Sequence, residues 1–172
     1  MALPFGTIES LNVTVVVYWQ FRDNEGPSWS QENSPGSSSV NMFTIFIVDD
    51  DWSVLKALSR LLRAKAYEVC SYASPQAFLA AHDPAIPGCA VLDLSMPGLD
   101  GLELQQALRA GGSRRPVIFI SGKGDIPTSV RAMRSGAIDF LTKPVSPKHL
   151  LEAIARAEEQ DTKSRQIRAE VA

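Results

Sequence analysis

Short apolar runs in this chain are followed by residues whose side chains can do chemistry. Asp49 and Asp50 follow FTIFIV, Asp93 follows CAVL, Ser121 follows PVIFI, and Lys143 follows AIDFLT. In an open parallel sheet the carboxyl ends of all strands lie on one edge, so these side chains are expected to meet in one crevice. Carboxylates, a hydroxyl and a lysine gathered in this way suit a hard metal ion and a phosphoryl group.

The acidic run Asp49–Asp51 has two interpretations. The residues cap the following helix and complement its dipole, or they contribute to a metal site. Asp93 favours the metal site, because it ends a strand that is expected to lie beside the first one and across from Asp50. Carboxylates held together repel each other, and a cation relieves that repulsion. Oxygen ligands favour Mg²⁺, and the backbone carbonyl of Ser95 is expected to complete the protein's share of the ligands.

The same crevice contains a candidate nucleophile. The sequence offers no catalytic cysteine, serine–histidine pair or zinc-ligand cluster, so we expect the carboxylate of Asp93 to accept a phosphoryl group. Lys143 is expected to neutralise the phosphoryl oxygens, and Ser121 to hydrogen-bond them. The alternatives are a solvated loop lysine at position 143 and a serine at position 121 that serves only a turn.

Composition and charge limit the class of protein. The 172 residues include 17 Lys and Arg against 19 Asp and Glu, a net charge of −2, which does not favour direct nucleic-acid binding by this chain. No apolar run approaches the roughly 20 residues that span a membrane, and no secretory signal is evident. We therefore expect a cytoplasmic protein in which Cys70 and Cys89 are buried thiols.

A composition change divides the chain. Residues 26–41 are rich in Ser, Gly and Pro, which is typical of a flexible linker, so a boundary is expected near Met42. Residues 1–42 are expected to be an N-terminal extension that is disordered or a gene-start artefact. Residues 43–160 are expected to form the domain, and residues 161–172 a polar tail or the start of a linker helix.

From Phe43 onward, apolar runs alternate with stretches of helical period. This pattern predicts a doubly wound α/β domain of five parallel strands with helices on both faces. The predicted strands are 43–48, 67–72, 89–93, 116–120 and 137–141, and the predicted helices are 52–65, 75–81, 102–110, 127–135 and 147–160. Ser74 and Ser146 are expected helix N-caps, and Gly136 is expected in a left-handed turn. His82 and His149 are expected to be exposed and have no assigned role.

These motifs together resemble the receiver domains of two-component response regulators, which have the CheY-like, flavodoxin-like fold. The resemblance covers about residues 43–160 and is carried by VDDD, VLDLSMPGLDG, SGKGD and AIDFLTKP. The stretch SGKGDIPTSVRAMRSGAIDFLTKP is most similar to receivers of the FixJ type, which commonly carry a DNA-binding helix-turn-helix after the receiver. Residues 161–172 are too few for such a domain, so the output is expected to lie elsewhere.

The resemblance implies a strand order of 2-1-3-4-5 and a set of roles for the crevice residues. It implies that Asp49, Asp50 and Asp93 hold Mg²⁺. It implies that a sensor histidine kinase phosphorylates Asp93. It also makes Ser121 and Lys143 the contacts of the phosphoryl group.

The resemblance further implies a switch rather than an enzyme, with self-dephosphorylation at most. Phe140 would be an aromatic switch residue coupled to Ser121; alternatively, it is an ordinary core aromatic. The phosphorylated form would change partner binding, or form a homodimer through the fourth helix, fifth strand and fifth helix, upstream of transcriptional control. No membrane association is implied.

Two other functions remain open at this point. A Mg²⁺-dependent phosphatase or phosphotransferase would turn over a small substrate through an aspartyl phosphate, but Ser95 stands where haloacid-dehalogenase-type enzymes place a second acid. A flavin-binding doubly wound domain has the same strand order, but the acidic run Asp49–Asp51 would repel an anionic cofactor.

Overall fold

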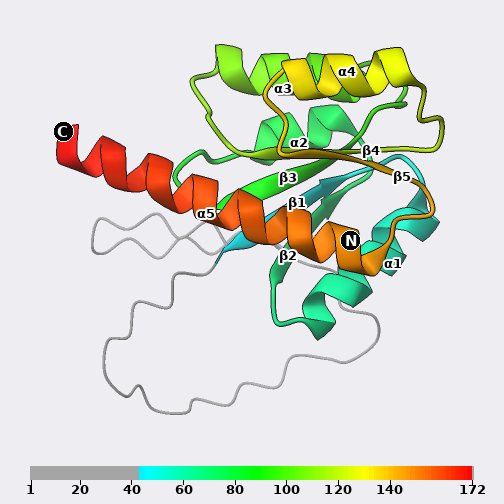
Figure 1. Cartoon of the computed structure of the whole chain (residues 1–172), viewed down its shortest axis with the longest axis horizontal. Coiled ribbons are helices and arrows are strands. Elements are labelled where there is room, and N and C mark those ends of the chain that lie inside the picture. Colours follow the sequence, from blue (N-terminus) through cyan, green and yellow to red (C-terminus); the bar gives the residue numbers. More distant parts are fainter. Residues whose placement is uncertain (1–42, 172) are drawn as a thin grey trace, which may run out of the picture. The chain divides into compact units, whose positions relative to one another are not determined.

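Strand and helix alternate along the part of the chain that the computed structural model describes, residues 43–171 (Figure 1). The strands are β1 (Thr44–Val48), β2 (Glu68–Tyr72), β3 (Gly88–Asp93), β4 (Val117–Ser121) and β5 (Asp139–Thr142). The helices are α1 (Trp52–Ala64), α2 (Pro75–Ala81), α3 (Gly101–Ala110), α4 (Ile126–Arg134) and α5 (Pro147–Val171). The predicted extension 1–42 lies outside the described residues.

All five strands are parallel and lie in the order β2-β1-β3-β4-β5. Both the predicted fold class and the predicted strand order are therefore confirmed. The order reverses between β1 and β3, because the chain first builds outward to β2 and then returns to the other side of β1. In sheets of this kind the crevice for ligands forms at that reversal, beyond the carboxyl ends of the strands.

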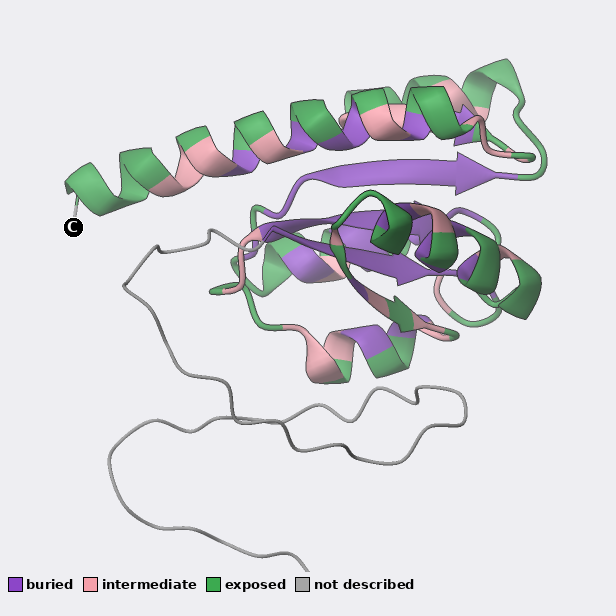
Figure 2. Ribbon diagram, turned by 90° about the horizontal axis from the view of Figure 1, so that it is seen from below, coloured by how far each residue is buried: buried purple, intermediate pink, exposed green. Residues whose placement is uncertain are grey.

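The sheet separates two apolar layers, because successive side chains of a strand point to opposite faces. In β1, Ile45 and Ile47 pack with the helices α1 and α5. Phe46 and Val48 pack on the other face with α2, α3 and α4. Figure 2 shows the central strands buried between these layers, while the final turns of α5 are exposed. Burial on both faces explains why the strands read as continuous apolar runs rather than alternating ones.

The helix starts follow the expected capping chemistry. The Oγ of Ser74 accepts a hydrogen bond from the N–H of Ala77 at 3.1 Å, as predicted for the N-cap of α2. The Oγ of Ser146 accepts one from the N–H of His149 at 3.5 Å. Gly136, after α4, has φ +82°, a left-handed conformation that glycine adopts without steric cost. Its predicted turn is confirmed.

Most predicted boundaries differ from the structure by one or two residues, and the C-terminal helix differs most. It was predicted to run to about Gln160, followed by a polar tail or the start of a linker helix, and α5 continues to Val171. The apolar period that was used to predict it stops earlier, since Ala157 is its last buried apolar residue. Polar contacts, rather than an apolar face, accompany the continuation of the helix.

Asp161 and Arg165 fasten the continued part of α5 to the loop before β3. Asp161 is 5% exposed, and its Oδ2 accepts hydrogen bonds from the N–H of Gly88 at 3.1 Å and from Arg165 Nε at 2.8 Å. The guanidinium of Arg165 also donates to the carbonyl oxygens of Pro84, Ala85 and Ile86 at 2.9–3.1 Å. One arginine thus satisfies three loop carbonyls, and one carboxylate holds the first residue of β3.

Two further expectations concern cysteine burial and membrane spans. Cys89 is fully buried, as predicted, and burial raises the pKa of its thiol to about 12. Cys70, in β2, is half-buried rather than buried. Within residues 43–171, every helix is too short or too polar to cross a bilayer.

We expect Arg165→Ala to loosen the attachment of α5 to the loop before β3. The substitution removes the donors to three carbonyls and leaves Asp161 buried without its ion pair, at a cost on the order of 2 kcal/mol. Amide hydrogen exchange of Gly88 and of residues 162–166 should accelerate by about tenfold or more.

Lys163→Ala is the matched control for this variant. Lys163 forms the same i,i+4 type of ion pair with Glu159, but both side chains are about two-thirds exposed. Exposed pairs contribute little to stability, so exchange in this variant should stay near the wild-type rate. Equal exchange in the two variants would contradict the role given to Arg165.

Candidate functional site

The strand register brings the predicted site residues to one edge of the sheet. Val48 pairs with Leu92, so the next residues along, Asp49 and Asp93, stand side by side at the ends of β1 and β3. Asp93 in turn pairs with Ile120, the residue before Ser121. Ser121 pairs with Thr142, the residue before Lys143. The expected convergence at the carboxyl ends of the strands is therefore what the structure shows.

Lys143 forms ion pairs with two of these carboxylates. Its Nζ lies 2.7 Å from Asp49 Oδ2 and 3.5 Å from Asp93 Oδ2. Both carboxylates are nearly inaccessible, at 0% and 2% exposed. The interpretation of Lys143 as a solvated loop lysine is wrong, because its ammonium group is held between two buried acids. The Lys143–Pro144 peptide bond is cis.

The pKa values of this pair reflect burial and mutual charge. Burial, followed by the negative charge of Asp49, raises the pKa of Asp93 to about 6. The N–H of Ser95 and the ammonium of Lys143 act in the opposite direction. Burial alone would lower the pKa of Lys143, but its hydrogen bonds and charge interactions with Asp49 and Asp93 outweigh burial and raise it. Lys143 therefore stays charged at neutral pH, and Asp93 takes up a proton at a higher pH than an ordinary aspartate.

The carboxylates also satisfy the geometry of a cation site. Asp49, Asp50 and Asp93 each offer one oxygen, and these oxygens lie within 4.8 Å of one another. Asp49 Oδ2 is buried, and apart from its ion pair with Lys143 it has no hydrogen-bond partner in the described part of the chain. Asp50 is exposed, which leaves an open side toward solvent. An all-oxygen, partly open donor set of this kind fits Mg²⁺, which keeps several waters when few carboxylates bind it.

Both interpretations of the acidic run apply, each to different residues. Asp51 is the N-cap of α1, and its side chain accepts hydrogen bonds from the N–H of Ser53 at 2.8 Å and from its hydroxyl at 2.6 Å. These hydrogen bonds lower the pKa of Asp51. The N–H of Asp51 also donates to Asp49 Oδ1 at 2.8 Å, which fixes the carboxylate of Asp49. Asp51 thus caps the helix, whereas Asp49 and Asp50 gather with Asp93.

Ser121 is 3% exposed and is engaged in a turn. Its Oγ donates to the carbonyl of Lys123 and accepts from the N–H of the same residue, both at 3.1 Å. The predicted turn role is therefore present, and contact with a phosphoryl group stays a prediction.

Phe140 and Ser95 lie close to the site. Phe140 in β5 is half-buried beside the layer formed with α2, α3 and α4, and it pairs in register with Phe119. The N–H of Ser95 donates to Asp93 Oδ1 at 3.3 Å. The predicted use of the carbonyl of Ser95 as a ligand stays a prediction.

Some contributors to this edge were not recognised from the sequence. Gly101, the first residue of α3, lies so close to the end of β3 that an added Cβ would be 2.5 Å from the carbonyl oxygen of Asp93. The backbone of Gly124 approaches β5 in a similar way, with an added Cβ only 2.6 Å from Thr142 and 3.5 Å from Phe140. A glycine at these sequence positions was the available signal, but only the folded chain shows what each one approaches.

Comparison with known proteins agrees with this geometry. Residues 45–155 match the family model described as the response regulator receiver domain. The chain belongs to the response regulator receiver family. Nodulation protein W of Bradyrhizobium diazoefficiens is 42% identical over 128 residues, covering 74% of this chain and 56% of that protein. Response regulator protein TmoT of Ectopseudomonas mendocina is 48% identical over 113 residues, covering 66% and 51%.

Solved structures give the same family and fold. The response regulator StyR has a TM-score of 0.70 and 44% identity, covering 73% of this chain and 64% of that one. The structure titled FixJ-N has a TM-score of 0.64 and 40% identity, covering 68% and 94%. This receiver chain spans about half the length of the first curated relatives that it matches.

Family membership also helps to choose among the functions that the sequence left open. The relatives are named as response regulators and transcriptional regulatory proteins, and so a signalling role is supported. The alternative function, a Mg²⁺-dependent phosphatase or phosphotransferase, is not favoured. The flavin-binding reading gains no support from these relatives either.

We expect Asp93→Asn to stabilise the metal-free receiver at pH 7.5. The pKa of Asp93 is about 6 in the folded chain, above its ordinary value of 3.8. Between these values the folded state binds the proton more readily than the unfolded chain, so ionisation of Asp93 as the pH rises lowers stability. A neutral amide avoids that cost, which is on the order of 1 kcal/mol. Thermal unfolding in EDTA between pH 4 and 8 measures the difference.

The gain should shrink as the pH approaches 4, where Asp93 is protonated in the folded protein. Asp139→Asn is the control, because it removes a carboxylate that pairs with Arg156 on the surface between β5 and α5. That variant should show no gain at any pH. An Asp93→Asn protein less stable than wild type at pH 7.5, or a gain independent of pH, would contradict the electrostatics described.

Proposed function

We propose that this receiver accepts a phosphoryl group on Asp93 from a sensor histidine kinase and acts as a signalling switch. The observation that supports the proposal best is the position of Asp93. Its Oδ2 lies 3.5 Å from the ammonium of Lys143, and its carboxylate shares a cation-binding geometry with Asp49 and Asp50. Phosphoryl transfer depends on positioning and charge stabilisation, and this edge of the sheet supplies both.

The proposed reaction is a displacement at phosphorus. A carboxylate oxygen of Asp93 attacks the phosphorus of a phosphohistidine, so that an O–P bond forms while the P–N bond breaks and the imidazole leaves. Asp93 must be ionised to attack, which its pKa of about 6 permits at neutral pH. Lys143, which pairs with both buried acids, would contact the negative oxygens of the transferred group.

A divalent cation completes the proposed site. Asp49, Asp50 and Asp93 would hold Mg²⁺, with the backbone carbonyl of Ser95 as a further ligand. When bound, the ion supplies positive charge that stabilises the phosphoryl oxygens in the transition state. Asp51 supports this set, because its N–H fixes the carboxylate of Asp49.

The proposed switch connects Ser121 to Phe140 through one short loop. For Ser121 to hydrogen-bond a phosphoryl group, its hydroxyl must leave the carbonyl of Lys123. The loop released in this way includes Gly124, whose backbone lies against Phe140 and Thr142. A change of rotamer at Phe140 would therefore accompany the movement of Ser121, and it would alter the face formed by α4, β5 and α5.

That face has exposed apolar residues that suit a protein contact. Ile126, Val130 and Met133 on α4 are 80%, 42% and 47% exposed. Large exposed apolar residues grouped on one element favour a binding surface. We propose that phosphorylation changes the binding of this face to a partner or to a second copy, in the cytoplasm and upstream of transcriptional control. Relatives named transcriptional regulatory proteins, TdiR and FixJ, support this output.

Acetyl phosphate with Mg²⁺ tests the phosphoacceptor directly. Wild-type protein should gain one phosphoryl group, seen as a shifted band on a phosphate-affinity gel, and Asp93→Asn should gain none. Lys143→Ala should be labelled more slowly, by on the order of 10²-fold, because it loses the charge that faces the transferred group.

Asp139→Asn serves as the matched control for labelling. It changes a carboxylate at the start of β5, at the other end of that strand from Lys143, and it should be labelled like wild type. Persistent labelling of Asp93→Asn, or labelling of wild type that does not depend on Mg²⁺, would contradict the proposal.

A further inference from the structure

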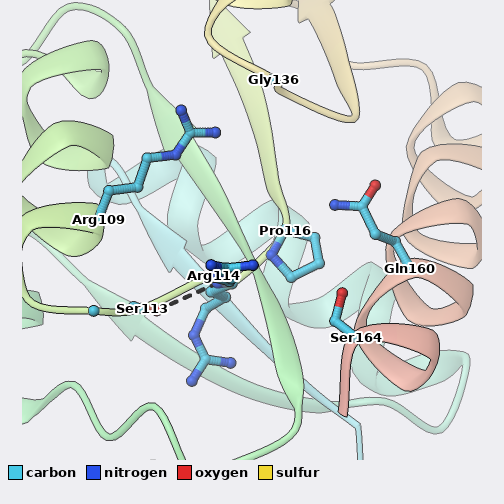
Figure 3. Close-up of a pocket in the computed structure, with 9 residues that line it drawn as sticks. Arg109, Ser113, Arg114, Pro116, Gly136, Gln160 and Ser164 are labelled. Carbon is cyan, nitrogen blue, oxygen red and sulfur yellow. Dashed lines mark hydrogen bonds between the residues drawn. The ribbon is translucent and has the colours of Figure 1, made fainter. Parts of the chain in front are cut away.

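A hollow lies at the other end of β4 from Ser121. It has a volume of about 560 Å³ and forms where Pro116 leads into β4. Arg109 comes from α3 on one side, and Gln160 and Ser164 come from α5 on the other, with Pro116 between them (Figure 3). Arg114 and Arg115 complete its positive lining. We call this hollow the arginine pocket.

The charge of the arginine pocket is only partly balanced by the residues around it. Among the described residues, its lining includes three arginines and no Asp or Glu. Within residues 43–171, no carboxylate lies within 4.0 Å of the guanidinium groups of Arg109, Arg114 or Arg115. Burial lowers the pKa of Arg115 to about 10, although the charges of Asp161 and Asp83 act in the opposite direction. Asp161 is itself paired with Arg165. Like charges brought together without a counterion repel one another, and an anion in the hollow relieves that repulsion.

Arg115 is a fixed part of the fold rather than a mobile surface side chain. It is 8% exposed and stacks over the ring of Phe46 at 4.4 Å. Its Nε donates to Nε2 of His82 at 3.0 Å, and its Nη2 donates to the carbonyl of Asp83 at 2.8 Å. Nη1 is buried and has no hydrogen-bond partner in the described part of the chain. Its charge is therefore held in place while one donor remains unused.

These contacts also correct the expectation for His82. The sequence predicted an exposed residue without a role, but His82 is half-buried and accepts the hydrogen bond from Arg115. Burial, followed by the charge of Arg115, lowers the pKa of His82 to about 4. The imidazole is therefore neutral at pH 7 and does not add to the positive charge here. His149 is exposed, as expected.

The exposed guanidinium of Arg109 lies against the turn that follows α4. An added Cβ at Gly136 would lie 2.9 Å from Arg109 Nη2. The hydroxyl of Ser113, which is buried, accepts the N–H of Arg115 at 3.3 Å and fixes the backbone of the following segment. Gln160 and Ser164 add neutral hydrogen-bonding groups from α5.

We propose that the arginine pocket binds a small, multiply charged anion that carries phosphate groups. Guanidinium groups match phosphate oxygens in a bidentate manner, and the volume lies within the range of small-molecule sites. In the part of the chain that the structure describes, its lining has no aromatic side chain on which a nucleobase would stack, so recognition is directed at the phosphates. The site is independent of the proposed phosphoacceptor, because β4 separates it from the acidic edge of the sheet.

Calorimetric titration of the metal-free protein with pyrophosphate tests the proposal. The double variant Arg109→Ala with Arg114→Ala removes the two exposed arginines of the pocket and keeps the buried Arg115. Binding should weaken by about 100-fold, roughly tenfold for each charge-assisted contact. Backbone amide shifts of Gly112 and Ser113 on titration should report the same site.

The double variant Arg131→Ala with Arg134→Ala is the matched control. It removes two exposed arginines from the last turn of α4 and changes the net charge equally. Its affinity should stay within about threefold of wild type, since the loss is then only of long-range attraction. Lys143→Ala should also bind pyrophosphate like wild type, which separates this site from the acidic edge. No binding at millimolar pyrophosphate, or equal weakening in both double variants, would overturn the proposal.

Discussion

Negative charge concentrated at one edge of the sheet is the constraint on which this structure depends. Two buried carboxylates, Asp49 and Asp93, stand side by side because β1 and β3 are adjacent and parallel. Burial, followed by the negative charge of Asp49, raises the pKa of Asp93, and the ammonium group of Lys143 pairs with both carboxylates. A single lysine cannot neutralise three acids. The edge therefore keeps negative charge that a bound cation would balance.

Polar groups also lie at the opposite ends of the strands that form this edge of the sheet. β3 begins at Gly88, whose N–H is bound by Asp161, and it ends at the phosphoacceptor candidate Asp93. β4 begins beside the arginine pocket and ends at Ser121. A Cβ at Gly88 would lie 2.0 Å from the carbonyl oxygen of Thr44, so β1 and β3 approach closely where the polar contacts of α5 meet them. β3 and β4 thus each run from polar groups at one end to a candidate site residue at the other.

The convergence of the site was accessible from the sequence because it follows from a simple rule. Parallel strands end on one edge, so a polar residue after each apolar run is enough to predict that Asp49, Asp93 and Lys143 meet. The sequence did not show that Asp49 is buried while its neighbour Asp50 is exposed. It also did not show that Asp51 belongs to the helix cap rather than to the cluster. The different burial and roles of Asp49, Asp50 and Asp51 depend on the path of the backbone in the single turn between β1 and α1.

The structural features that the sequence did not predict depend on contacts between distant parts of the chain. Arg115 reaches His82, and Arg165 reaches the loop that contains Ala85, through polar contacts that leave no apolar period. Periodicity reports which residues face a core, and it therefore predicted an end for α5 near its last buried apolar residue. Side-chain donors that satisfy loop carbonyls have no such signature, so the attachment of the continued helix to the loop before β3 and the arginine pocket emerged only from the folded chain.

The position of a bound divalent cation tests the central claim most directly. Crystals of the protein grown with Mn²⁺ in place of Mg²⁺, and with beryllofluoride as a phosphoryl mimic, would locate the metal by its anomalous signal. The account predicts one peak within bonding distance of the carboxylates of Asp50 and Asp93, with the mimic on Asp93 and against Lys143. A metal bound elsewhere, or a mimic that leaves Asp93 untouched, would contradict it.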